Sequence, residues 1–274
     1  MAAAVVLIGG CSPHTFFYYP NNVLYVEPHH LNLSYEMVFF PSENGKKLFG
    51  LLFRTKQDPQ GIVVHFHGNF GNVSNHFIGA TFMLDHGFDV LVFDYEGFGG
   101  SEGRPSPART VGDGMAALKL AAALDRNPKG GVVVLAQSLG GAVAIPAIAR
   151  EPFVRAAVIQ STFPNYRMIA RDVLKRSVIT WILWPIYPQL LWTRYEPLNW
   201  VDKLPRIPLL FIHGDHDNVI PMKMTKILFA RAHEPKELWI VPGAGHNGLR
   251  QEAGDEYDRR VADFFSRAVA TSKG

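Results

Sequence analysis

The fold is decided at residues 131–141, which read GVVVLAQSLGG. The first six residues form a near-continuous apolar run rich in valine, which is typical of a strand covered on both faces of a parallel sheet. Ser138 follows directly, and the small residues of 139–150 predict a helix behind it. A serine at such a sharp turn is held in a strained conformation with its Oγ above the sheet. The neighbours two positions away must be small, and Ala136, where glycine is usual, and Gly140 meet this requirement.

Strands and helices alternate on both sides of this turn. Apolar or alternating runs predict strands at 35–40, 47–54, 62–66, 89–93, 131–136, 156–160, 209–213 and 237–241, and helical spacing predicts helices at 74–86, 111–124, 139–150 and 255–270. The first two strands flank the turn SENG and are expected to form an antiparallel hairpin. Helices between buried strands predict an α/β fold with a mostly parallel central sheet and helices on both faces.

Composition limits the class of protein. A chain of 274 residues can bury the core of one large domain, and 47% hydrophobic with 19% charged residues is typical of a globular protein. The net charge of +3 is small, and no run of basic residues concentrates it. These features argue against a nucleic-acid partner.

The N-terminus contains the only cysteine of the sequence, Cys11, which excludes an intramolecular disulfide. An apolar run at residues 2–10 leads into the sequence IGGC, which resembles the lipobox of bacterial lipoproteins. This resemblance predicts a signal segment at 1–11 and a single domain at 12–274. A lipid on Cys11 would then hold the protein on the periplasmic side of the bacterial cell envelope. The alternative is an apolar N-terminal end that is not processed, which places the protein in the cytoplasm.

A long segment at 161–201 interrupts the alternation, since about forty residues separate two strands. It begins with an amphipathic stretch and continues through the aromatic and aliphatic residues of 177–192. Pro185 and Pro188 and the short length exclude a membrane-spanning helix. Two interpretations stay open, a small cap over an apolar pocket and a buried satellite core. The first suggests an apolar acyl group or a lipid as substrate.

A glycine-rich loop follows an early strand and reads HFHGNFGN at residues 65–72. Such a loop can turn a backbone N–H toward the serine and complete an oxyanion hole with the N–H of Leu139 at the start of the helix. Asn69 is the candidate donor, and Phe70 is the alternative. His67 is expected to brace the loop. His65 and His67 are not expected to hold a metal, because no third ligand lies near them in sequence.

Two later strands end in residues that could complete a catalytic triad. The segment 213–221 reads HGDHDNVIP, and both Asp215 and Asp217 are well placed after a buried strand to hold an imidazole by its Nδ1–H. His246 lies in the glycine loop GAGHN after the last strand. The order Ser138, aspartate, His246 is the order typical of a hydrolase triad built on an α/β sheet.

Taken together, these segments resemble the α/β-hydrolase superfamily over about residues 31–270. They are most similar to small bacterial lipoprotein hydrolases with an HGNxGN loop, which are relatives of the eukaryotic depalmitoylase-like hydrolases. The matching segments are HGNFGN (67–72), FDYEGFGGSEG (93–103), QSLGG (137–141), HGDHDNVIP (213–221) and GAGHN (243–247). The resemblance implies the α/β-hydrolase fold and assigns the triad acid to Asp217 over Asp215. Glu96 departs from the pattern, because arginine is common there.

The expected function is hydrolysis of ester or thioester bonds through an acyl-enzyme. Ser138 would be the nucleophile, His246 the general base and Asp217 the residue that orients the histidine. The expected substrate is a small-molecule or lipid-like acyl compound, with no cofactor. Two alternatives remain, a non-catalytic binding protein with the same fold and a serine peptidase with the same triad.

Overall fold

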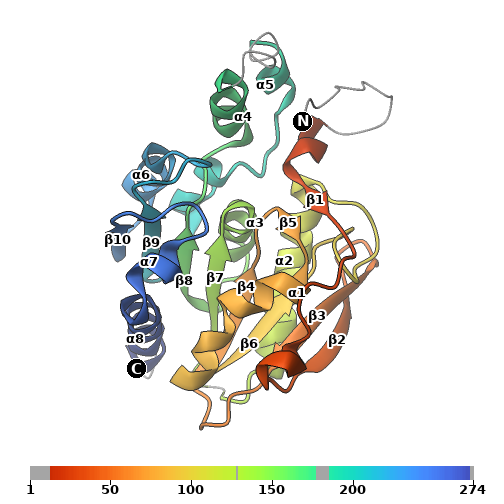
Figure 1. Ribbon diagram of the computed structural model, residues 1–274, viewed down its shortest axis with the longest axis vertical. Helices are drawn as coiled ribbons and strands as arrows, with labels where there is room; N and C mark the ends of the chain where they lie inside the picture. Colours follow the sequence, from red (N-terminus) through yellow and green to blue (C-terminus); the bar gives the residue numbers. More distant parts are fainter. Residues whose placement is uncertain (1–12, 128, 177–184, 272–274) are drawn as a thin grey trace.

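The computed structural model describes residues 13–127, 129–176 and 185–271. At the centre of this part lies an eight-stranded sheet with the order β10-β9-β8-β7-β4-β6-β3-β2 (Figure 1). Its strands are β2 (Glu36–Pro41), β3 (Lys47–Phe53), β4 (Gly61–Phe66), β6 (Phe88–Phe93), β7 (Val132–Gln137), β8 (Val154–Gln160), β9 (Leu209–Gly214) and β10 (Lys236–Val241). The pairs β2–β3 and β3–β6 are antiparallel, and the remaining pairs are parallel. The predicted α/β class with a mostly parallel sheet is confirmed.

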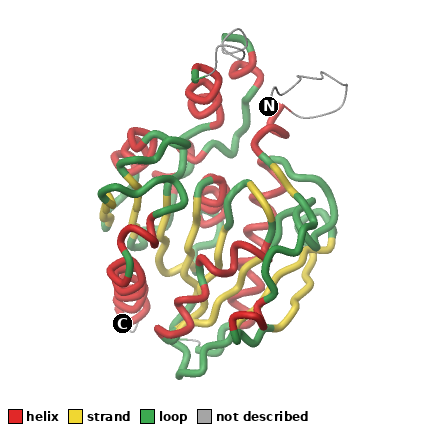
Figure 2. Tube along the Cα trace, viewed as in Figure 1, coloured by secondary structure: helices red, strands yellow, loops and turns green. Residues whose placement is uncertain are grey.

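Helices cover both faces of this sheet (Figure 2). They are α1 (Val73–His76), α2 (Pro107–Leu124), α3 (Leu139–Ile148), α4 (Tyr166–Lys175), α5 (Tyr187–Leu190), α6 (Met222–Arg231), α7 (Leu249–Ala253) and α8 (Asp255–Thr271). None of the helices in the described part of the chain is long and apolar enough to cross a bilayer. Cys11 and residues 177–184 lie outside the described residues.

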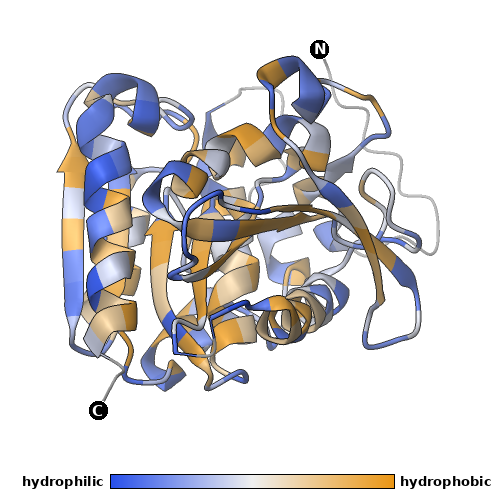
Figure 3. Ribbon diagram, turned by 90° about the horizontal axis from the view of Figure 1, so that it is seen from below, coloured by the Kyte–Doolittle hydropathy of each residue, from blue (hydrophilic) through white to orange (hydrophobic). Residues whose placement is uncertain are grey.

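Two hydrophobic cores follow from the alternation of side chains along each strand. In β4, Val64 packs with α2 and α3 on one face, whereas Val63 packs with α1 and α8 on the other. His65, the next residue, therefore points to the face of α1 and α8. Figure 3 shows the hydrophobic residues gathered in the strands and on the helix sides that face them. The sheet is buried on both faces, as the valine-rich run of β7 predicts.

Some local predictions were wrong. The helix expected at 74–86 is divided into α1 and two short 3-10 helices, Phe77–Gly79 and Thr81–His86, and Ala80, with φ −126°, separates these two. The helices α6 and α7 were not predicted. A further two-stranded parallel sheet, β1 (Tyr19–Pro20) with β5 (Phe70–Gly71), joins the N-terminal segment to the glycine-rich loop.

The segment 161–201 contributes α4 and α5. From its described part, Phe163, Tyr166 and Ile169 are buried in the core on the α2 and α3 side of the sheet. In Figure 1, α4 and α5 rise above the sheet beside the N-terminal end, and the Tyr187 hydroxyl donates to the Pro13 carbonyl at 2.6 Å. The described residues of this segment therefore extend the core.

Glu96, the departure from the family pattern, lies beside a second buried acid. Its backbone N–H donates to Oδ2 of Asp113 at 2.8 Å, and its side chain is almost fully buried. The Nε of Arg109 lies 3.9 Å from the Glu96 carboxylate, too far for a hydrogen bond. Burial raises the pKa of Asp113 to about 8, and the charge of Glu96 adds to this effect.

Replacing Asp113 by asparagine should make the protein more stable at alkaline pH. The pKa of Asp113 is about 8 in the folded protein and about 4 in the unfolded chain. The folded state therefore binds more protons between these values, and this carboxyl lowers stability as pH rises, by up to about 1.4 kcal/mol per pH unit. Thermal unfolding at pH 5, 7 and 9 should show a Tm difference between Asp113→Asn and the parent that grows with pH up to about 8. A constant difference would contradict this assignment.

Candidate active site

The turn at Ser138 has the strained backbone that its position predicts. Ser138 has φ 55° and ψ −118°, a conformation that residues other than glycine rarely adopt. Neighbouring strands hold it there, since its N–H donates to the Gln160 carbonyl at 2.9 Å and its carbonyl accepts from the Thr162 hydroxyl at 2.7 Å. Ser138 thus lies between the end of β7 and the start of α3.

Gly140 is required by the close approach of α3 to β4. A Cβ on Gly140 would lie 2.0 Å from the carbonyl oxygen of Phe66 and 2.5 Å from its carbonyl carbon. Backbone atoms cannot move aside as a flexible side chain can, so no larger residue fits. Ala136, two positions before the serine, is fully buried and is accommodated with its single methyl group.

Three loops at the carboxyl ends of the strands bring Ser138, His246 and Asp217 together. His246 Nε2 lies 3.0 Å from Ser138 Oγ, and His246 Nδ1 lies 2.8 Å from Asp217 Oδ2. Asp215 does not reach the histidine. It is exposed, and its Oδ1 accepts from the Gly243 N–H at 2.7 Å.

The Asp217 carboxylate is held by more than its histidine partner. Its Oδ1 accepts from the N–H groups of Val219 and Ile220, each at 2.8 Å, and His213 Nε2 lies 3.3 Å from Oδ2. Burial alone would raise the pKa of Asp217, but the hydrogen bonds from His213, His246 and Ile220 lower it well below the usual range. The residue therefore carries a negative charge at neutral pH beside the imidazole.

His213 was not predicted to support the site. It is fully buried, its Nε2 donates to the Ile220 carbonyl at 2.9 Å, and its Nδ1 lies 2.8 Å from the Thr225 hydroxyl. The Thr225 hydroxyl lies 3.1 Å from the Thr162 carbonyl. The only signal in the sequence was its place at the end of a buried strand, four residues before Asp217.

The proposed oxyanion donors come from the start of α3 and from the glycine-rich loop after β4. Leu139 is the first residue of α3, so its N–H belongs to the unsatisfied N-terminus of that helix. Asn69 and Phe70 line the same cavity as Ser138, and the Asn69 carbonyl accepts from the Tyr19 N–H at 2.9 Å. His67 braces this loop, because its Nδ1 donates to the Gly68 carbonyl at 2.7 Å.

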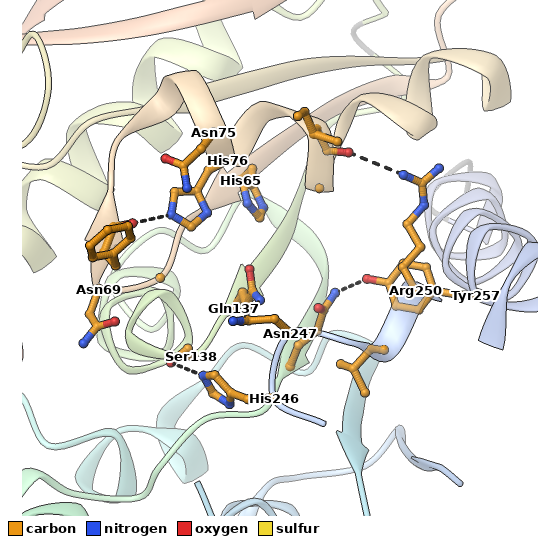
Figure 4. A pocket seen from close by; sticks show the side chains of 16 residues that line it. His65, Asn69, Asn75, His76, Gln137, Ser138, His246, Asn247, Arg250 and Tyr257 are labelled. Carbon is orange, nitrogen blue, oxygen red and sulfur yellow. Dashed lines mark hydrogen bonds between the residues drawn. The ribbon is translucent and has the colours of Figure 1, made fainter. Parts of the chain in front are cut away.

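A cavity of about 370 Å³ opens beside Ser138. Figure 4 shows Ser138 and His246 along one side of it, with His65 and His76 across the open space. Most of its lining side chains are polar, and none of the lining residues is an aspartate or glutamate. The described residues of 161–201 do not line it either. The lining residues are His65, Gly68, Asn69, Phe70, Asn75, His76, Ile78, Gly79, Gln137, Ser138, Gln160, His246, Asn247, Leu249, Arg250 and Tyr257.

Among the described residues, one group of three side chains brings metal-type ligand atoms within 4.8 Å of one another, namely Glu27, His29 and His30. None of the three lines the cavity.

Comparison with known proteins identifies the family. The sequence model of the family described as serine aminopeptidase, S33, matches residues 57–206, more than half of the chain. The chain belongs to this α/β-hydrolase family. The resemblance inferred from the motifs is confirmed.

Relatives and solved structures extend the match beyond that range. YfhR of Escherichia coli (strain K12) is 33% identical over 263 residues, covering 93% of this α/β hydrolase and 87% of YfhR. Protein bem46 of Schizosaccharomyces pombe is 26% identical, covering 87% of this chain and 79% of its own. The esterase Pf2001 of Pyrococcus furiosus has a TM-score of 0.76 at 21% identity, covering 92% and 98% of the two chains. At this identity the structural likeness shows the fold, and the predicted α/β-hydrolase fold is confirmed.

Proposed function

We propose that this α/β hydrolase cleaves ester or thioester bonds through an acyl-enzyme formed on Ser138. The observation that carries the proposal is the continuous hydrogen-bonded chain from Ser138 Oγ through the His246 ring to Asp217 Oδ2. Both contacts have the lengths expected of a nucleophile with its base and of a base with its orienting acid.

The reaction follows from these contacts. His246 Nε2 takes the Oγ proton as Ser138 attacks the carbonyl carbon of the substrate. The resulting oxyanion accepts hydrogen bonds from the N–H groups of Leu139 and of Asn69, with Phe70 as the alternative donor. The imidazolium then gives its proton to the leaving alcohol or thiol, and the acyl group stays on Oγ. A water molecule, deprotonated by His246, attacks the acyl-enzyme and releases the acid.

Asp217 keeps His246 in the tautomer that these reaction steps need. Because its carboxylate only accepts hydrogen bonds, it holds the proton on His246 Nδ1 and leaves Nε2 free to act as the base. Its negative charge also stabilises the imidazolium that forms during each proton transfer.

The cavity favours an ester over a peptide with a free amino terminus. An aminopeptidase must bind the ammonium group of its substrate, and a carboxylate is the side chain suited to that charge. None of the residues that line the described cavity is acidic, and Arg250 among them is cationic. Peptidase activity is therefore the less supported use of the same triad.

A fluorophosphonate probe tests the proposal, because it reacts with an activated serine and not with an ordinary hydroxyl. We expect the folded protein to gain one adduct, located by mass spectrometry on the peptide that contains Ser138. Protein unfolded in detergent before exposure should remain unlabelled. A folded protein that gains no adduct would favour the non-catalytic binding protein.

A further inference from the structure

His65 lines the cavity, and one of its ring nitrogens has no hydrogen-bond partner among the described residues. It is in β4, its side chain is almost fully buried, and it borders the same cavity as Ser138. Its Nδ1 lies 3.1 Å from the Leu135 carbonyl of the adjacent strand. Among the described residues, its Nε2 has no hydrogen-bond partner. A buried polar atom of this kind is costly to leave unpaired.

The bond to Leu135 determines which nitrogen carries the proton. A carbonyl oxygen can only accept, so Nδ1 donates and carries the hydrogen. Burial lowers the pKa of His65 to about 3, and the neighbouring His76 adds to this effect. The ring is therefore neutral at physiological pH, and its buried Nε2 carries a lone pair that has no partner among the described residues, in a side chain that lines the cavity.

The surrounding wall indicates the kind of donor that this lone pair takes. An ammonium group is disfavoured, because no carboxylate lines the cavity and the guanidinium of Arg250, which does line it, is paired with Asp258. Amide groups of Asn75 and Asn247 also line it, and the Tyr257 hydroxyl accepts from Gln160, which leaves its own proton free to donate. A hydroxyl group suits both the acceptor and the donors of this wall, since it can donate to His65 Nε2 and accept from an N–H or O–H group.

We propose that this cavity binds a hydroxyl group of the substrate at Nε2 of His65, so that the preferred esters carry a hydroxyl on their acyl or alcohol part. The inference rests on the proposed esterase function and names its substrate class. A purely apolar acyl group would leave Nε2 and the amide groups unpaired. A site built to bond a hydroxyl discriminates strongly against the analogue that lacks it.

Gly79 provides a way to block Nε2 without changing His65. An added Cβ on Gly79 would lie 3.9 Å from Nε2, an ordinary van der Waals distance, with no other atom closer than 4 Å. Gly79 does not have a positive φ, so alanine fits its backbone. Gly79→Ala therefore covers the acceptor, and His65→Leu removes it.

The test compares esters that differ only in one hydroxyl. One arm uses the nitrophenyl esters of 2- and 3-hydroxybutyrate against that of butyrate, and the other uses 2-hydroxyethyl butyrate against propyl butyrate. We expect kcat/KM to favour the hydroxylated ester by about tenfold in at least one arm. His65→Leu and Gly79→Ala should each bring that ratio close to one.

The matched control is His86→Leu, in the 3-10 helix Thr81–His86 and outside the cavity, which should keep the parent ratio. If the parent protein shows a kcat/KM ratio near one in both arms, the inference is overturned. It is also overturned if the preference for the hydroxylated ester persists in Gly79→Ala and, where that variant folds, in His65→Leu. If His65→Leu fails to fold, Gly79→Ala decides alone. If the plain butyrate ester is hydrolysed in a reaction that depends on Ser138, and the hydroxylated esters react no faster, this inference is overturned and the proposed function stays intact.

Discussion

Replacing Ser138 by alanine is expected to lower kcat/KM for ester hydrolysis by about 10⁴- to 10⁶-fold. The variant lacks the Oγ on which the proposed acyl-enzyme would form. Only direct attack of water on the ester remains, which is slow. Alanine keeps the Cβ, so the backbone at φ 55° and the bonds of Ser138 N–H and carbonyl to Gln160 and Thr162 are retained. Activity on a nitrophenyl ester and the Tm of the same preparation measure the two effects separately.

Ser106→Ala is the control for this change. Ser106 caps α2 by accepting from the Arg109 N–H, so its loss should lower stability by about 1 kcal/mol without changing the rate. Ester hydrolysis by Ser138→Ala within tenfold of the parent would show that another group is the nucleophile.

Asp217→Asn should lower kcat by about 10⁴-fold. The asparagine oxygen would keep the bonds from the Val219 and Ile220 N–H groups, which places its amide NH₂ toward His246 and His213. Two donors then face each other at His246 Nδ1. The histidine gives up the Nδ1 proton, carries it on Nε2 and no longer accepts from Ser138. Steady-state kinetics on the nitrophenyl ester provide the measurement.

Asp215→Asn separates the two candidate acids of the same loop. Asp215 accepts from the Gly243 N–H, a bond that the amide oxygen of asparagine can also accept. Because Asp215 is exposed and does not contact His246, we expect a change in rate of less than about threefold. A large loss with Asp215→Asn and a small one with Asp217→Asn would reverse the assignment.

Local sequence patterns were sufficient for the strands and for the turn at Ser138. The valine run of β7, the serine and Gly140 lie within a few residues of one another, so the pattern of the elbow can be recognised locally, although distant residues hold it in place. The helix predicted at 74–86 is divided in the structure, because α1 ends at His76 and Ala80 leaves the helical conformation. The helix α7 has five residues, too few for a periodic pattern to appear.

The cavity could not be predicted from sequence, because its walls come from distant parts of the chain. His65 is on β4, Asn247 follows β10 and Tyr257 is on α8. Each residue has an ordinary local setting, and only the packing of α1 and α8 on one face of the sheet brings them together. For the segment 161–201, hydrophobicity alone does not distinguish a pocket wall from a core, so both interpretations stay open.

The buried contacts around His213 have a consequence for how the triad works. Ser138, Thr162, Thr225, His213 and Asp217 form an unbroken series of contacts beneath the site, and His246 takes no part in it. The nucleophile and the acid are thus anchored to a common rigid frame. His246 comes from a loop with glycine on either side, at Gly245 and Gly248, and its ring contacts the frame through its bonds to Ser138 and Asp217. In the proposed reaction, Ser138 and Asp217 would therefore keep their spacing, and the His246 ring would be the one of the three that moves between Ser138 Oγ and the leaving group.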